Sequence, residues 1–255
     1  MKDFRLHGAP DPLTDEQYDE QRKGKQWPGT VFLVVKTNNT NQWKSIFNKY
    51  KSNRIEWGIT GHSLHRAAET KCPYALLLVL RTSNLEKCKS YLASEDFKKF
   101  LLESGTLNSP EKYFSVDIDK TLTTVPKDKG GILWVRLFAK PIFSFSAISE
   151  GFFYDWRDIS KKNGFEFNKW ESDFIFQDLY NQRFIYLTLR VSDMRKAKNY
   201  LKTPNFNILL KKAWGVLDEP YIWLGTNLEQ SDYENHAEVP TISNFNLHHS
   251  THLSK

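Results

Sequence analysis

The chain has 255 residues, of which 40% are hydrophobic and 26% charged, proportions typical of a globular protein. Its formal net charge of +6 is mild for this length and, without a long basic run, indicates a lysine-rich surface rather than one built for nucleic acid. No run approaches the ~18 consecutive apolar residues of a membrane-spanning helix. With no apolar signal region after Met1, and with only Cys72 and Cys88 as cysteines, we expect a cytoplasmic location.

The chain begins with a polar segment, residues 1–30, whose glycines and prolines predict an extended N-terminal arm. Strands and helices then alternate over residues 31–118 in the order β-α-β-β-α-β. The expected strands are Val31–Lys36, Arg54–Thr60, Tyr74–Arg81 and Tyr113–Ile118, and the expected helices are Asn41–Lys51 and Leu85–Ser104, the second with a break near Ser94.

The same order recurs over residues 132–224, and a polar tail follows at residues 225–255. The expected strands are Ile132–Ala139, Trp170–Gln177, Phe184–Val191 and Tyr221–Leu224, and the expected helices are Ser146–Lys161 and Met194–Ala213.

The two halves also match letter by letter. A shift of 109 positions, the distance from Arg81 to Arg190, superimposes identical residues well beyond the apolar pattern, Tyr91 on Tyr200 among them. A shared helix-capping pattern would explain only part of this agreement, so the sequence predicts an internal duplication.

The strand Tyr74–Arg81 is apolar on both faces, so the face of its sheet that the helices leave bare must be covered as well. The matching sheet of the second half is the simplest cover. We therefore expect an α+β fold in which two ferredoxin-like βαββαβ repeats pack sheet to sheet as an intramolecular α+β barrel. This arrangement resembles the dimeric α+β barrel superfamily. The resemblance implies relatives among cofactor-free monooxygenases, isomerases, haem proteins and sensors, with ligands held between the sheet and the helices of one unit.

Candidate catalytic residues lie in the first half, in the polar segment Trp57–Arg66. His62 and His65 could serve as a general base or a haem ligand, with Trp57 beside the ligand, or they could be ordinary histidines of a surface loop. Arg81 and Arg190 follow the apolar strands of the two halves. They could bind an anionic ligand at a helix N-terminus or form structural salt bridges.

Candidate ligand-binding residues of the second half are Arg136, Asp173 and Gln177, which strand alternation could point into a cavity or away from it. The histidines of the tail fit no familiar metal site, so we predict no metal centre from His236, His248, His249 and His252. The sequence leaves the identity of any cofactor open.

Three functions remain open at this stage. The first is small-molecule binding, with enzyme status undecided and a monooxygenase- or isomerase-like reaction as one form of it. The second is a structural or regulatory interaction module that uses the arm and the tail. The third and least favoured is RNA binding, because the strands Tyr74–Arg81 and Phe184–Arg190 lack the aromatic pattern of an RRM.

Overall fold

The computed structural model describes residues 28–68, 75–117, 130–138, 162–166, 173–179, 181, 183–208 and 218–233. Outside these residues lie Cys72, most of the expected arm, the helix expected at Ser146–Lys161 and the histidines of the tail. Within them, every helix is too short or too polar to cross a bilayer.

The first half contains β1 (Gly29–Lys36), α2 (Thr40–Lys49), α3 (Lys51–Glu56), β2 (Ile59–Ala67), β3 (Ala75–Thr82), α4 (Leu85–Ala93), α5 (Glu95–Glu103) and β4 (Glu111–Asp117). The second half contains β5 (Gly131–Phe138), β6 (Phe165–Glu166), β7 (Asp173–Asp178), β8 (Phe184–Val191), α7 (Met194–Leu201) and β9 (Tyr221–Asp232). The order β-α-β-β-α-β expected for the first half is confirmed.

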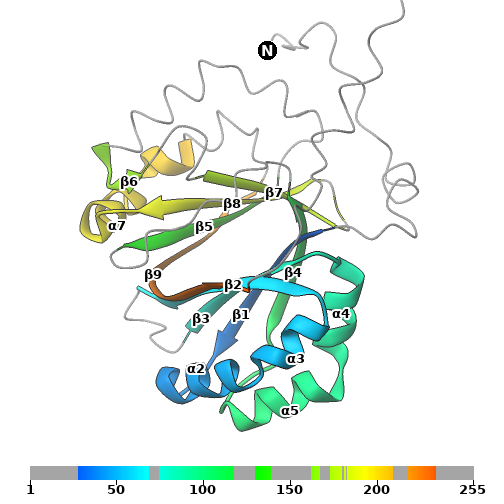
Figure 1. Ribbon diagram of the computed structural model, residues 1–255. Coiled ribbons are helices and arrows are strands. Elements are labelled where there is room, and N and C mark those ends of the chain that lie inside the picture. The colour runs from blue at the N-terminus through cyan, green and yellow to red at the C-terminus, as the bar shows by residue number, and fades with distance from the viewer. Residues whose placement is uncertain are drawn as a thin grey trace, which may run out of the picture.

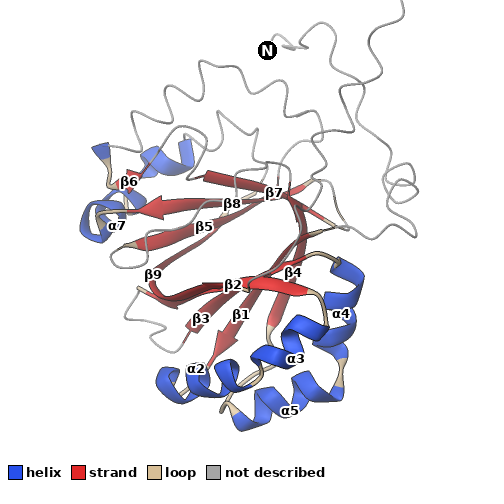
Figure 2. Cartoon of the chain, in the orientation of Figure 1, coloured by secondary structure: helices blue, strands red, loops and turns tan. Residues whose placement is uncertain are grey.

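The strands of the described residues form one antiparallel sheet that closes on itself (Figures 1 and 2). The ring runs β1, β4, β7, β8, β5, β9, β2, β3 and back to β1, with β6 added outside β8. Within it the first half has the strand order β4-β1-β3-β2 and the second half the matching order β9-β5-β8-β7. The halves join at two seams, β4–β7 and β2–β9. A common origin of the halves stays a prediction.

Three apolar clusters fill this architecture. The first lies between the sheet and helices α2–α5, which cover the outer side of the first half (Figure 1). The second lies on the outer side of the second half, against α7. The third lies inside the barrel, where inner side chains of both halves meet, with the Phe32 and Trp134 rings 5.3 Å apart. The apolar inner faces therefore cover one another, as the sequence led us to expect.

Two differences from the expected elements affect the site. The strand expected at Arg54–Thr60 is wrong, because residues 51–56 form α3 and β2 begins at Ile59. The alternation of Ile55, Trp57 and Ile59 misled the prediction. Gly58, with φ of +78°, turns the chain from helix to strand in a conformation that other residues rarely adopt.

The last strand extends to Asp232 rather than ending at Leu224, and its polar second half pairs with β2. The break expected near Ser94 is confirmed, since Ser94 ends α4 and its hydroxyl accepts a hydrogen bond from the Phe97 amide to cap α5. The helix expected at Met194–Ala213 begins at Met194 as α7 but ends at Leu201, earlier than expected.

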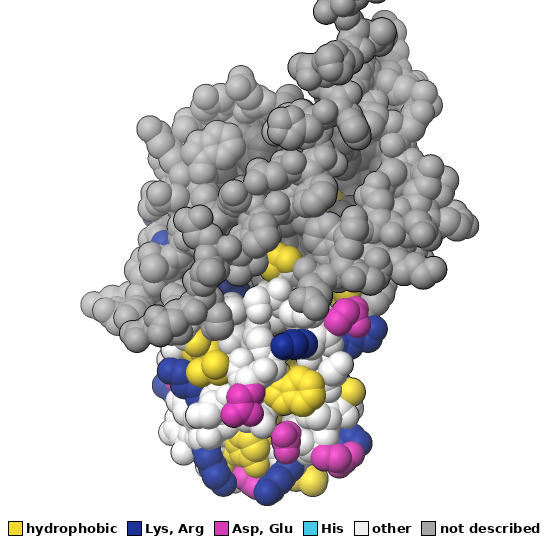
Figure 3. All heavy atoms as spheres, turned by 45° about the vertical axis from the view of Figure 1, so that its right-hand side comes forward, with side chains coloured by type: hydrophobic (Ala, Val, Ile, Leu, Met, Phe, Trp, Pro, Cys, Tyr) yellow, Lys and Arg dark blue, Asp and Glu magenta, His cyan; other side chains and the backbone are white. Residues whose placement is uncertain are grey.

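The described part of the surface carries charges of both signs. On the face shown in Figure 3, basic and acidic side chains are interspersed with single apolar ones, and neither described histidine is visible. Both are buried, so the loop histidines considered from the sequence belong instead to the interior of the protein.

Candidate functional site

Strand β2 positions its two histidines on opposite sides of the sheet. Side chains alternate along a strand, so residues three apart face opposite ways. His62 faces the helices, where its ring lies 4.8 Å from that of Phe47, on the same side as Leu64. His65 faces the barrel interior, on the same side as Ala67. The structure therefore does not bring the two candidate catalytic histidines together.

A β-bulge in β9 supplies the acidic partner of His62. In the pairing with β2, Leu64 lies opposite Glu229 and His65 lies opposite Asn227, so Leu228 is an extra residue. Leu228 packs against the helix-side cluster, and the bulge lets Glu229 reach the same side. β9 also ends beside Tyr233, whose ring is buried and whose amide donates a hydrogen bond to the Thr60 carbonyl.

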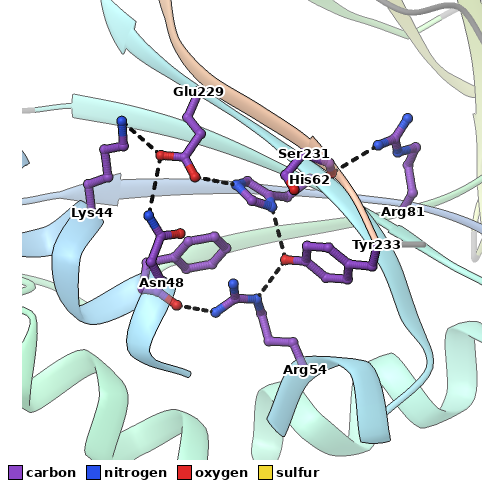
Figure 4. A network of polar contacts seen from close by, with 9 residues as sticks. Lys44, Asn48, Arg54, His62, Arg81, Glu229, Ser231 and Tyr233 are labelled. Atoms are coloured by element: carbon purple, nitrogen blue, oxygen red, sulfur yellow. Dashed lines mark hydrogen bonds and ion pairs between the residues drawn. The ribbon is translucent and has the colours of Figure 1, made fainter. Parts of the chain in front are cut away.

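These residues form a connected polar network, shown in Figure 4. The His62 Nδ1 atom lies 2.9 Å from the Tyr233 hydroxyl oxygen, and Arg54 Nε donates a hydrogen bond of 3.0 Å to that oxygen. On the other side of the ring, His62 Nε2 lies 3.4 Å from Glu229 Oε1. Glu229 Oε2 in turn pairs with Lys44 Nζ at 2.8 Å and accepts a longer hydrogen bond from Asn48.

The chemistry of the partners fixes the direction of this network. The Arg54 guanidinium can only donate, so the Tyr233 oxygen accepts from it and keeps its own proton for His62 Nδ1. His62 Nε2 faces a carboxylate, which favours the tautomer with the proton on that nitrogen. The chain of donors then runs from Arg54 through Tyr233 and His62 to Glu229. At 3.4 Å the last contact is long for a hydrogen bond and can tighten when the imidazole gains charge.

The surroundings keep the proton-carrying groups of the network neutral. Burial, and after it the charge of Arg54, lowers the pKa of His62 to about 4, against the opposing effect of Glu229. Burial raises the pKa of Tyr233, against the opposing charge of Arg54. Partial burial raises the pKa of Glu229, but the hydrogen bond and charge of Lys44 outweigh it and hold that pKa below its usual value. Near neutral pH the site therefore contains a neutral imidazole between a phenol and a carboxylate.

Arg54 is the residue that sequence reasoning missed most completely. Its side chain is 1% exposed, its Nη1 donates to the Phe47 carbonyl, and its guanidinium carbon lies 3.5 Å from the centroid of the Phe47 ring. Residues 51–56 are helical, and Arg54 lies on the buried side of this helix. The strand expected from the sequence would have given its side chain a different direction. Glu229 and Tyr233 were missed because they lie in what reads as a polar tail.

His65 has a different environment. Its Nδ1 lies 2.7 Å from Asn227 Oδ1, which can only accept, and its Nε2 lies 2.9 Å from the Ser63 hydroxyl. Burial lowers the pKa of His65 to about 4. Both ring nitrogens of His65 thus have hydrogen-bond partners, whereas His62 Nε2 is buried without one and has only the 3.4 Å contact with Glu229.

The other candidates of the first half lie near the network without joining its donor chain. Arg81 reaches the Ser231 carbonyl at 3.3 Å across Gly61, where a side chain would collide with its guanidinium (Figure 4). Trp57 follows α3, and its ring is 6.1 Å from that of Tyr91.

The candidates of the second half lie apart from the network. Arg136 places its guanidinium over the rings of Phe184 and Tyr113, at 4.1 and 5.1 Å from their centroids. Arg190 pairs with Ile132 and is half-buried. For Asp173 and Gln177 the structure gives backbone pairing with β8, and their role in ligand binding stays a prediction.

Comparison with solved structures shows which fold this is. An anthrone oxidase-like protein aligns over 83% of this chain and 95% of its own, with a TM-score of 0.53 at 12% identity. A candidate monooxygenase from Fusobacterium nucleatum aligns over 81% of this chain and 95% of its own, with a TM-score of 0.51 at 12% identity. At such identities the likeness shows the fold alone, so this chain shares the fold of these two proteins. No family model and no curated protein matches the sequence.

Proposed function

We propose that the protein binds a small organic molecule beside the polar network of the first half and removes a proton from it, as a monooxygenase- or isomerase-like enzyme. The observation that carries the proposal is the buried donor chain from Arg54 through Tyr233 and His62 to Glu229. A neutral imidazole held between a phenol and a carboxylate is an arrangement that moves protons.

The proposed step begins at the Tyr233 oxygen. As a substrate C–H or O–H proton passes to this oxygen, the phenol proton passes to His62 Nδ1. The imidazolium that forms is stabilised by Glu229, whose carboxylate faces Nε2. The substrate is left as an anion. Returning the proton to another carbon gives an isomerase, and reaction of the anion with O₂ gives a monooxygenase.

The similar fold of an anthrone oxidase-like protein suggests the first substrate to test. Anthrone has an acidic CH₂ group between two aromatic rings. Its oxidation converts CH₂ and O₂ into C=O and H₂O, so the atoms balance without another co-reactant.

The test is oxygen uptake by the purified protein with anthrone, together with mass spectrometry of the product. Tyr233→Phe removes the hydroxyl and is expected to lower the rate by about 10²–10⁴-fold. Tyr221→Phe is the matched control, a tyrosine on β9 with 44% of its surface exposed, and should leave the rate unchanged.

The isomerase reading has its own signature. In D₂O the protein would exchange the substrate C–H for deuterium without consuming oxygen, and Tyr233→Phe would abolish the exchange. If neither oxygen uptake nor exchange depends on Tyr233, the proposal is wrong. A visible absorption spectrum of the purified protein, free of any haem band, should accompany these assays, because a haem would offer a different route.

A further inference from the structure

The Arg54 guanidinium is a buried positive charge without a matching negative charge among the described residues. Two of its nitrogens donate to neutral acceptors, the Tyr233 hydroxyl and the Phe47 carbonyl. The third nitrogen, Nη2, is buried and has no hydrogen-bond partner. A buried charge that is neither paired nor fully hydrogen-bonded destabilises the folded state, because the charge has lost its contact with water.

The nearby carboxylate does not balance this charge. Glu229 approaches the network through His62, and Lys44 already holds its other oxygen at 2.8 Å. Arg54 and Lys44 therefore share one carboxylate across a neutral imidazole. The tyrosines that feel the charge of Arg54, Tyr91 and Tyr233, have raised pKa values because of burial and supply no anion.

The surroundings of Arg54 restrict what could supply the missing negative charge. The Phe47 ring covers one face of the guanidinium, so its edge at Nη2 is what a ligand could meet. The Tyr233 oxygen lies on the adjoining edge, where Arg54 Nε donates to it. A planar ligand with an oxygen at its rim would bring that oxygen to Nη2 once the side chain that covers this atom moves aside.

We infer that Arg54 is an oxyanion-binding residue and that the ligand of this site is a planar organic molecule that carries or forms an oxyanion, such as a phenolate or an enolate. The choice of ligand rests on the proposed function. Removal of a proton beside Tyr233 creates negative charge on the substrate, and a fixed buried cation stabilises that charge without reorganisation. Because Nη2 is covered in this structure, the ligand must displace a side chain, and binding is expected to be slower than diffusion.

The test uses 4-nitrophenol, whose phenolate is yellow and whose neutral form is not. A pH titration of the probe with saturating wild-type protein gives the pKa of the bound phenol. A guanidinium beside the oxygen should lower that pKa by about 1–3 units relative to the free probe. A bound probe whose pKa is unchanged or raised would overturn the inference, and this result needs no variant.

Variants then assign the shift to Arg54. Arg54→Met should abolish the shift, and Arg54→Lys, which keeps the charge but loses the fork of donors, should retain part of it. Arg195→Met, an exposed arginine on α7, is the matched control and should behave as wild type. A shift that survives in a folded Arg54→Met protein would contradict the inference, and Arg54→Lys serves the same purpose if Arg54→Met does not fold.

The two proposals can fail separately. A lowered probe pKa that depends on Arg54, without oxygen uptake or exchange, would support the oxyanion site and overturn the enzymatic function. Catalysis that depends on Tyr233, with no change in the pKa of the bound probe, would keep the function and overturn the role of Arg54.

Discussion

The two histidines of β2 make a natural comparison, because they share residue type, strand and burial. Each is 2% exposed, and burial lowers the pKa of each to about 4. They differ in their partners. His65 is held by Asn227 and Ser63, two neutral groups of neighbouring strand positions, whereas His62 is held by Tyr233 and Glu229 with two cations nearby. Burial and pKa therefore do not distinguish the two histidines, and the charge of their partners does.

The two sides of the sheet differ in what surrounds their buried polar groups. The barrel interior is packed with aromatic side chains, and its buried polar atoms without a hydrogen-bond partner include the indole nitrogens of Trp134 and Trp223 and Nε of Arg136, whose guanidinium lies over two aromatic rings. On the helix side of the first half, the buried guanidinium of Arg54 has one nitrogen without a hydrogen-bond partner. Another of its nitrogens donates to the hydroxyl of Tyr233 in the polar network. The two buried guanidinium groups therefore differ in their neighbours, because Arg136 lies over aromatic rings and Arg54 donates to a tyrosine hydroxyl that contacts a histidine.

The largest expected effect is the pH dependence of stability, which both histidines should share. In the unfolded chain their pKa is about 6.5, and in the folded protein about 4, so between these pH values the unfolded chain binds more protons. The free energy of unfolding should be constant above pH ~6.5, fall as the pH drops toward ~4, and lose about 3 kcal/mol per histidine across that window.

Denaturant unfolding at a series of pH values measures this loss. His62→Gln and His65→Gln keep groups that can donate and accept hydrogen bonds but cannot titrate, so each should remove about half of the slope. Stability that stays flat over this window in the wild-type protein, or a slope that persists in the double variant, would show that the burial of the histidines does not shift their pKa values.

The next largest effect concerns the barrel interior alone. Trp134 is fully buried and contacts Phe32, Tyr113 and Tyr186, with ring centroids 5.3 to 6.0 Å apart. Trp134→Ala should lower the free energy of unfolding by about 3–5 kcal/mol, because it leaves a cavity between the halves. Leu102→Ala on α5, where the side chain is 83% exposed, is the control and should stay within about 0.5 kcal/mol of wild type. Equal effects of the two substitutions would mean that the halves do not pack face to face.

The sequence predicted features that depend on local patterns and missed features that depend on contacts between distant residues. Apolar periodicity acts over a few residues, and it placed β1, β3 and β4 of the first half and the break between α4 and α5, but not β2. The site depends on contacts that no local pattern encodes. His62 and Tyr233 meet although 171 positions separate them, and β9 reads as a tail because its second half is polar.

The role of Arg54 was missed for a different reason, which is that the local secondary structure was predicted wrongly. The alternation of Ile55, Trp57 and Ile59 fits a short strand, but so short a pattern does not exclude a helix that ends within it, and only the packing of α3 against the sheet decides between them. An arginine in a charged segment is expected to face solvent, so its burial could not be inferred from composition.

The smallest effect tests the comparison most directly, through Lys44. The ion pair of Lys44 with Glu229 is partly exposed, so Lys44→Met should change the free energy of unfolding by about 1 kcal/mol or less.

The effect of Lys44→Met on the pKa values of the two histidines is more specific. With Lys44 gone, a cation is removed from the neighbourhood of Glu229 and the carboxylate is free to pair with His62, so the pKa of His62 should rise. His65 lies on the opposite face with neutral partners, and its pKa should not move. NMR titration of the two imidazole rings measures both in one sample, with His65 as the internal control. Equal shifts of the two rings, or a shift of His65 alone, would mean that charge is not what distinguishes the two faces of β2.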